Sequence, residues 1–156
     1  MKIIAKKQPN SIACGPTSIF MVTRFFGDSI TFKHIEQLSE YKKHDGMTDK
    51  QICALFNRIG YIAEHTVNTK WQDIKQFLDS GFAIIVSWMK DGYKGHVSVV
   101  QKISDTHIYL ADPDVGKIIK IEKIKFMRLW MEYDDLWWPE KVSDINLRSI
   151  IKIRKK

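Results

Sequence analysis

The chain has 156 residues, of which 44% are hydrophobic and 28% charged, a size and composition typical of one soluble globular domain over residues 1–156. Its net charge of +7 permits an acidic partner, a membrane surface or nucleic acid, although a lysine-rich solvated surface explains the charge more simply. The longest apolar run, Phe82–Val86, is far shorter than the roughly 20 residues that span a bilayer, so we expect no membrane span. Met1–Lys7 lacks the apolar run of a signal peptide, so we expect a cytoplasmic protein.

The first predicted element is a helix that begins at Cys14 and runs to Phe26. Apolar residues recur along it at helical spacing, Pro16 suits its first turn, and Gly27 suits the position just beyond its end. Cys14 therefore lies at the positive end of a helix, where backbone amides and the helix dipole favour an anion. Because the thiolate is the nucleophilic form of cysteine, we interpret Cys14 as an activated nucleophile.

Two further helices are predicted in the first half of the chain. The segment Thr31–Tyr41 has apolar residues at helical spacing, with its first residue as a candidate cap. Thr48–Gln51 forms a capping box at the start of the next helix, which Gly60 ends. Cys53 adjoins the apolar face of that helix and is most simply a small buried residue. A short strand is predicted at 61–67.

The pattern changes after a fourth predicted helix, which a second capping box at Thr69–Gln72 begins and Gly81 ends. Residues 82–89 are almost continuously apolar and of strand length, as in a central strand that is buried on both faces. Further elements are predicted as strands at 95–103, 106–111 and 117–121, a helix at 124–130 and a last strand at 145–153. Helices first and an antiparallel sheet second indicate an α+β fold.

A cysteine nucleophile needs a base within hydrogen-bond reach, and His96 is the best placed of the five histidines. It follows Gly95 at the start of the apolar segment Val97–Val100, whereas the other four histidines fall in polar or surface-like contexts. Spacing alone leaves two simpler interpretations open, in which Cys14 is a buried thiol and His96 is a structural residue.

The hairpin of the strands at 95–103 and 106–112 supplies an orienting group for His96. If the hairpin folds about Ser104, His96 lies directly opposite Asp112, with Cβ atoms ~4.5–5.5 Å apart. This register requires an odd-length loop or a bulge around 103–105, because a two-residue turn would put the two side chains on opposite faces. The alternative role for Asp112 is to start a turn and cap its backbone.

Four short motifs follow one another along the chain: Gln8–Gly15, with five residues between the glutamine and Cys-Gly; Asp45–Thr48 with Leu55–Gly60; Gly95–Val100; and Asp112–Gly116. In this order they resemble the motifs of the papain-like cysteine peptidases of the bacteriocin-processing type, family 39, which remove double-glycine leader peptides. The resemblance implies a papain-like fold in which N-terminal helices pack on a C-terminal antiparallel sheet.

The same resemblance implies a role for each site residue. Cys14 is the nucleophile, His96 the general base and acid, Asp112 the group that orients His96, and Gln8 the oxyanion donor. A side-chain amide can donate a hydrogen bond to the oxyanion of a tetrahedral intermediate, and a turn at Pro9 would bring the amide back toward the sulfur. Without the resemblance, Gln8 would be interpreted as an ordinary surface residue.

The chain departs from the family pattern in two ways. Ala13 replaces the acidic residue that usually precedes the cysteine, and neither an exporter segment nor a Walker-type glycine-rich loop is present. No CxxC or HxxxH pattern indicates a metal site. The sequence therefore predicts a cysteine peptidase, or thiol hydrolase, that acts on a peptide or protein without a cofactor or metal, while cleavage after a double glycine does not carry over automatically.

Two other functions remain open from the sequence. The same fold and thiol can transfer the acyl group to an amine or a thiol instead of water. Alternatively, the chain is a binding or regulatory protein with a vestigial site. The basic residues that could then bind nucleic acid, near Trp130, Trp137 and Trp138, are Lys117, Lys120, Lys123, Lys125 and Arg128. Solvated lysines and core or lid tryptophans are the favoured interpretation, so nucleic acid is not the expected partner. The segment 132–138 is a candidate border of the site, and the sequence leaves the oligomeric state undetermined.

Overall fold

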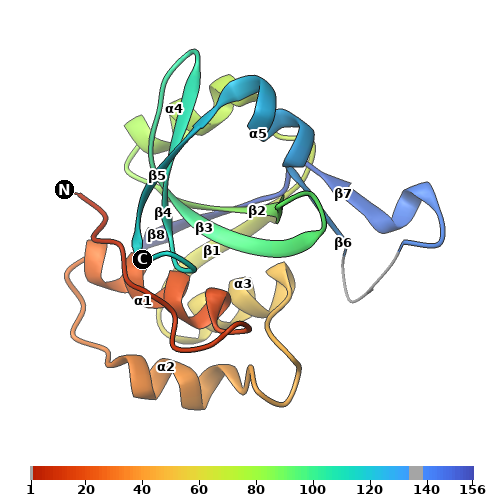
Figure 1. The fold of residues 1–156 in the computed structure, drawn as a ribbon. Helices are drawn as coiled ribbons and strands as arrows, with labels where there is room; N and C mark the ends of the chain where they lie inside the picture. The colour runs from red at the N-terminus through yellow and green to blue at the C-terminus, as the bar shows by residue number, and fades with distance from the viewer. Residues whose placement is uncertain (1, 134–138) are drawn as a thin grey trace.

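A computed structural model of the protein describes residues 2–133 and 139–156, and its fold is α+β, as predicted. Three helices form a layer beside a six-stranded antiparallel sheet (Figure 1). The helices are α1 (Cys14–Phe25), α2 (Phe32–Ser39) and α3 (Asp49–Arg58). Helices α1 and α3 pack against the sheet, and α2 packs on the other two.

The strands of the sheet lie in the order β1-β8-β2-β3-β4-β5. Their bounds are β1 (Tyr61–Thr66), β2 (Ala83–Lys90), β3 (Lys94–Ile103), β4 (His107–Asp112), β5 (Lys117–Glu122) and β8 (Ile150–Lys155). A second, two-stranded sheet joins β6 (Met131–Tyr133) to β7 (Ile145–Leu147), and the 3-10 helix η1 (Val142–Asp144) precedes β7. Two more helices, α4 (Trp71–Asp79) and α5 (Lys123–Leu129), lie on the side of the sheet away from α1–α3 (Figure 1).

A buried core lies on each face of the six-stranded sheet. On the face toward α1 and α3, side chains such as Val99 and Ile151 form one core with the helices. On the other face, side chains such as Val86 and Leu110 form a second core with α4 and α5, where Phe126 is fully buried. Strand β2 is buried along its length apart from Lys90, so the prediction of a central strand at 82–89 is confirmed.

Helix α1 begins at the predicted residue and ends one residue before the predicted end at Phe26. Cys14 is its first residue, Pro16 lies in its first turn, and Gly27 follows its end with a φ of 80°, a conformation that glycine adopts without steric cost. The helix buries one side, including Ile19 and Val22, against the sheet and α3. This packing fixes the direction in which the N-terminus of the helix, and therefore Cys14, points.

The caps of the other helices agree with the sequence in two cases of three. The Thr31 hydroxyl accepts a hydrogen bond from the backbone of α2, and Thr48 and Gln51 form the predicted capping box of α3. The predicted box at Thr69–Gln72 is wrong by one residue. Helix α4 starts at Trp71, and the backbone N–H of Lys70 donates to the Asp73 carboxylate instead.

A β-bulge at Gln101 determines which faces β3 and β4 share. On one side of it Val99 pairs with Ala111, and on the other side Lys102 pairs with Tyr109, so β3 holds one more residue than β4 between these pairs. Because side chains alternate along a strand, one extra residue exchanges the two faces. The predicted hairpin needed an odd-length loop or a bulge near the turn, and the structure has a bulge inside the strand.

The predicted direct pairing of His96 with Asp112 is wrong by two residues. Continuing the observed pairs puts Ser98 opposite Asp112. A shift of two residues keeps the face, so His96 and Asp112 still point to the same side and meet diagonally across the hairpin.

The predicted last strand, 145–153, is two strands in the structure. Arg148 has a φ of 51°, which breaks the extended chain between β7 and β8. Strand β7 then pairs with β6, and β8 inserts between β1 and β2 in the middle of the large sheet. In the part of the chain that the structure describes, no helix is long and apolar enough to cross a membrane.

The N-terminal segment crosses the turn between β4 and β5. The backbone N–H of Gln8 donates to the carbonyl of Pro113, with 2.7 Å between nitrogen and oxygen. Gly116, at the end of this turn, has a φ of 68°, and a Cβ placed on it would lie 2.7 Å from Lys7 Cβ and 2.9 Å from Lys7 N. Glycine is therefore required here for two reasons, its backbone conformation and the close approach of Lys7.

Replacing Gly116 with alanine should destabilise the protein more than the same change at Gly81. Gly81 has a φ of 84° but nothing within 4 Å of its missing Cβ, so Gly81→Ala should cost only the left-handed conformation, about 1–2 kcal/mol. Gly116→Ala adds a clash with Lys7, which should cost at least about 1 kcal/mol more. Urea unfolding of both variants measures the difference, and equal destabilisation would show that the N-terminal segment does not press on this turn.

Candidate active site

Cys14 and His96 meet where the N-terminus of α1 faces β3. Cys14 lies close enough to His96 for its thiol to raise the pKa of the imidazole. His96 is buried, with 5% of its surface exposed, and its ring packs edge-on against Trp88 at a centroid distance of 5.8 Å. The structure thus brings together a thiol and an imidazole that are 82 positions apart in the sequence.

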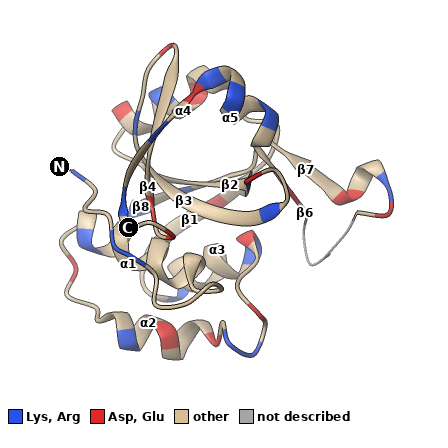
Figure 2. Cartoon of the chain, in the orientation of Figure 1, with Lys and Arg blue, Asp and Glu red and all other residues tan. Residues whose placement is uncertain are grey.

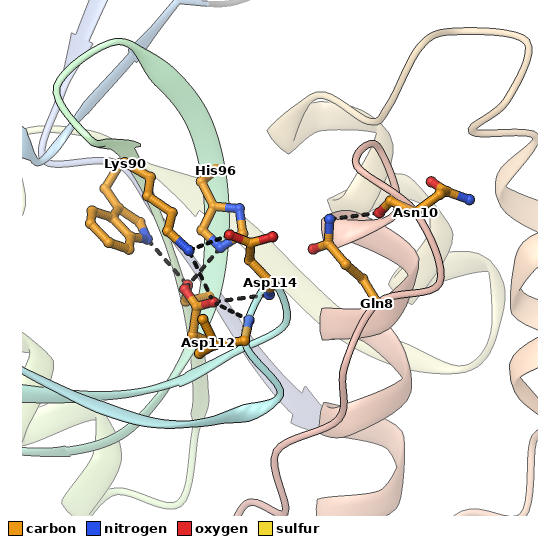
Figure 3. Close-up of polar contacts among 9 residues, drawn as sticks. Gln8, Asn10, Lys90, His96, Asp112 and Asp114 are labelled. Atoms are coloured by element: carbon orange, nitrogen blue, oxygen red, sulfur yellow. Dashed lines mark hydrogen bonds and ion pairs between the residues drawn. The ribbon is translucent and has the colours of Figure 1, made fainter.

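Asp112 holds the opposite side of the His96 ring. Its Oδ2 lies 2.9 Å from His96 Nε2 (Figure 3). With Nε2 engaged by the carboxylate, Nδ1 is the ring nitrogen that remains for the thiol of Cys14. The order thiol, imidazole, carboxylate is the arrangement in which a base deprotonates a nucleophile while a third group orients the base.

The carboxylate of Asp112 is fully buried and accepts hydrogen bonds on both oxygens. Oδ1 accepts from the backbone N–H groups of Asp114 and Val115, at 2.9 and 3.1 Å. Oδ2 accepts from the Ser98 hydroxyl at 3.0 Å as well as facing His96. The two roles considered from the sequence, capping the turn and orienting His96, therefore belong to different oxygens of one carboxylate.

Three further residues support Asp112 and were not identified from the sequence. The indole N–H of Trp88 donates to the Ser98 hydroxyl at 3.2 Å, and that hydroxyl donates to Asp112. Lys90 places Nζ 3.5 Å from Asp112 Oδ1 and bonds the carboxylate of Asp114 (Figure 3). A partial signal existed, because Ser98 lies two residues after His96 and so shares its face of the strand.

These contacts move two pKa values in opposite directions. Burial alone would raise the pKa of Asp112, but its hydrogen bond to His96 and the charges of His96 and Lys90 outweigh burial and lower the pKa to about 2. Burial alone would lower the pKa of His96, but its hydrogen bonds to Asp112 and Cys14 outweigh burial and raise the pKa to about 9. At neutral pH the pair is therefore an imidazolium and a carboxylate.

Gln8 lies beside this group, although its amide does not touch it. The side chain is buried, and Nε2 donates to the carbonyl of Asn10 at 2.7 Å (Figure 3). Its Oε1 has no hydrogen-bond partner among the described residues. Asn10 is itself held by its Nδ2, which donates to the Tyr41 hydroxyl at 2.9 Å. The turn after Gln8 that the sequence predicted is present, and the backbone N–H of Gln8 ties this residue to the turn of Asp112 through Pro113.

A second buried polar cluster lies at the start of α3. Asp49 accepts hydrogen bonds from the hydroxyls of Ser87 and Ser149 and lies 3.2 Å from His65 Nε2. Asp49, His65 and Glu132 bring potential metal-ligand atoms within 4.8 Å of one another. The bonds to Asp49 link α3, β1 and β2 to the start of β8, so this cluster has a structural explanation.

Of the segment 132–138, predicted as a candidate border of the site, residues 134–138 lie outside the described residues.

The sequence matches the Peptidase C39 family over residues 2–141. It is also 25% identical over 126 residues to the transport/processing ATP-binding protein ComA of Streptococcus pneumoniae, in strain R6 and in serotype 4 strain TIGR4. That alignment covers 80% of this chain but 17% of each relative, so the chain spans a small part of the curated proteins it matches.

Solved structures with the same fold cover almost the whole chain. The peptidase domain of Streptococcus ComA, a bi-functional ABC transporter involved in a quorum-sensing pathway, matches with a TM-score of 0.75 and 18% identity over 99% of both chains. A double-glycine-motif protease from an AMS/PCAT transporter, in complex with the leader peptide, matches with a TM-score of 0.71 and 15% identity over 97% of this chain and 91% of the other. The predicted papain-like fold is confirmed, and the chain belongs to the Peptidase C39 family of cysteine peptidases.

Proposed function

We propose that the protein cleaves a peptide through an acyl-enzyme on Cys14, with His96, Asp112 and Gln8 as its partners. The observation that carries this proposal is that His96, 2.9 Å from Asp112, lies beside Cys14 at the N-terminus of α1. A helix N-terminus and an adjacent imidazolium both favour the thiolate form of a cysteine.

In the proposed reaction the sulfur of Cys14 attacks the carbonyl carbon of the scissile peptide bond. The carbon–nitrogen bond breaks, and His96 gives its proton to the departing amine. A water molecule then attacks the thioester while His96 takes a proton from it, which releases the acid and restores Cys14. Asp112 keeps the ring of His96 oriented and stabilises its charged form.

Gln8 is proposed to stabilise the oxyanion together with the backbone N–H of Cys14. Gln8 is held beside the turn of Asp112 by two bonds, since its backbone N–H donates to Pro113 and its side-chain Nε2 donates to Asn10. To donate to an oxyanion, Nε2 must exchange its bond to the Asn10 carbonyl for one to the substrate oxygen. The Oε1 without a described partner is consistent with an amide whose present bonds are incomplete.

The proposed substrate is a peptide with a double glycine before the scissile bond. This specificity is supported by the double-glycine-motif protease and its leader-peptide complex, which share the fold. The transport activity of the longer relatives is not proposed, because the chain spans 17% of their length. We further propose that residues 1–156 act as one peptidase domain in the cytoplasm, where a reducing environment keeps thiols such as Cys14 and Cys53 free.

Cys14→Ala should abolish both peptide cleavage and labelling by a thiol-reactive activity probe, because no second nucleophile replaces the sulfur. Cys53→Ala is the matched control. Its thiol donates to the carbonyl of Ala63 in β1, and burial raises its pKa, so the variant should keep both activities. Labelling that moves to Cys53 in the Cys14→Ala variant, or cleavage that survives, would refute the proposed role of Cys14.

The substrate is tested by mass spectrometry of synthetic peptides that carry Gly-Gly or Ala-Ala at the same place. Cleavage after Gly-Gly alone is expected. Equal cleavage of both peptides would support the proposed peptidase activity but refute the proposed double-glycine specificity.

Gln8→Ala should lower kcat by roughly 10²–10³-fold with little change in KM, because the oxyanion exists in the transition state and not in the bound substrate. Gln8→Glu should be no better, since a carboxylate cannot donate. Steady-state kinetics of both variants provide the measurement. A change confined to KM would assign Gln8 to substrate binding.

Activity should fall as the pH rises through about 9, where His96 loses its proton.

The stability of the folded protein should depend on the same group. Because the folded-state pKa of His96 lies above its ordinary 6.5, its contribution to stability is complete below pH 6.5 and is lost as the pH rises through about 9. For Asp112 the sign is opposite, so its contribution is present above 3.8 and is lost as the pH falls through about 2.

Asp112→Asn removes the charge that favours the imidazolium and should move the alkaline limb of the pH–rate profile toward lower pH. The comparison of kcat/KM between pH 5 and 10 for the two proteins provides the test. An alkaline limb at the same pH in Asp112→Asn would show that the carboxylate does not control His96.

A further inference from the structure

More than half of the net charge of the protein lies in one short segment. Residues 117–129 contain five cations (Lys117, Lys120, Lys123, Lys125 and Arg128) against a single carboxylate, Glu122, which gives +4 of the total +7. The segment comprises β5, an edge strand of the sheet, and α5, which follows it directly. Lys123, Lys125 and Arg128 lie on α5, whereas Lys117 and Lys120 lie on β5, where Lys117 is paired in the strand register with Asp112. Figure 2 shows basic positions along α5, on the side of the sheet away from the layer of α1–α3.

None of these five cations forms an ion pair with any of the residues that the structure describes. Other lysines do pair, such as Lys75 with Asp79 and Lys152 with Glu64. In the basic segment, Lys120 lies over the ring of Tyr109 and Lys123 over the ring of Trp71, at 5.8 and 5.3 Å from the centroids. Their positive charges are therefore available to an external anion.

Apolar side chains lie among the cations on the outer side of α5. Ile124 is 61% exposed and Met127 is 36% exposed, whereas Phe126 on the inner side is fully buried. Since residues three and four apart share a face of a helix, Ile124 lies beside Met127 and Arg128, with Lys123 and Lys125 on the flanks. An exposed helix face with an aliphatic centre and basic flanks is the pattern of a segment that lies at a membrane interface.

The surface next to this face is hollowed and partly apolar. A cavity of about 830 Å³ opens between β5, α5 and the end of β2. Its lining combines apolar side chains such as Trp88, Ile119 and Leu129 with four cations (Lys90, Lys120, Lys125 and Arg128) and two carboxylates (Asp91 and Glu122). An anionic headgroup would therefore find an excess of cations beside an apolar surface.

We propose that β5 and α5 form a docking surface for a lipid bilayer that carries anionic headgroups. Each Lys or Arg near such a surface strengthens binding, and the aliphatic side chains can enter the interfacial layer while neighbouring lysines reach the headgroups. A bilayer is favoured over nucleic acid because the side chains exposed among the cations are aliphatic, whereas single-stranded nucleic acid binds to exposed aromatic rings. Ile124 borders the cavity but is 61% exposed, so most of its surface is available to a bilayer.

The test is sedimentation of the protein with vesicles, either of pure phosphatidylcholine or of phosphatidylcholine mixed with phosphatidylglycerol. Binding is expected to the mixed vesicles alone and should weaken as salt is added. Lys120→Glu with Lys125→Glu should weaken binding more than about 20-fold, because each cation near an anionic surface contributes about a fivefold factor. Ile124→Ser should weaken binding several-fold without any change of charge.

The matched control is Lys33→Glu with Lys42→Glu, which makes the same charge change at exposed positions in and after α2. This control should bind the mixed vesicles nearly as well as the unchanged protein. All variants should keep their thermal stability and their cleavage of a soluble peptide, because none of these residues touches Cys14, His96, Asp112 or Gln8.

Three outcomes would overturn the proposal. The first is no binding to mixed vesicles, and the second is equal weakening by the control and the α5 variants, which would reduce the effect to net charge. The third is an α5-dependent binding of a single-stranded DNA oligomer or of an acidic amphipathic peptide in the absence of vesicle binding. That result would assign the surface to nucleic acid or to a peptide.

Discussion

The buried carboxylate of Asp112 is the group on which the proposed site depends. A charge taken out of water is stable only where hydrogen bonds and opposite charges replace the solvent. Two backbone N–H groups, the hydroxyl of Ser98, the ring of His96 and the ammonium group of Lys90 do so here. One residue thereby joins the β4–β5 turn, the hairpin and the end of β2, and the orientation of the imidazole follows from how this carboxylate is held.

Local signals in the sequence predicted the parts of the structure that depend on nearby residues. The helix start at Cys14, the capping box of Thr48 and Gln51, and the buried strand at 82–89 each follow from chemistry within about one turn or one strand. The cap of α4 was misplaced because Thr69 and Lys70 both precede the helix, and the choice between them depends on the Asp73 carboxylate.

Features that depend on pairing between distant strands could not be predicted in the same way. The turn is longer than the predicted loop about Ser104, because Ile103 pairs with Ile108, and the bulge at Gln101 then shifts the pairing by one residue. The register of His96 and Asp112 was therefore wrong by two residues, although their shared face was right. Ser98, Trp88 and Lys90 were missed for the same reason, since their partner is in another strand. The division of 145–153 at Arg148 depends on β6 and β1, each of which pairs with one half.

The central position of β8 has a consequence for how the protein folds during its synthesis. Synthesis produces Cys14 early and His96 much later, yet β1 and β2 cannot close the sheet until residues 150–155 have entered the gap between them. Contacts between such distant parts of a chain form slowly, and the unfilled gap exposes two strand edges that can pair with other chains. The pairing of β8 therefore covers two strand edges at once, and it can do so only after the C-terminal residues have been synthesised.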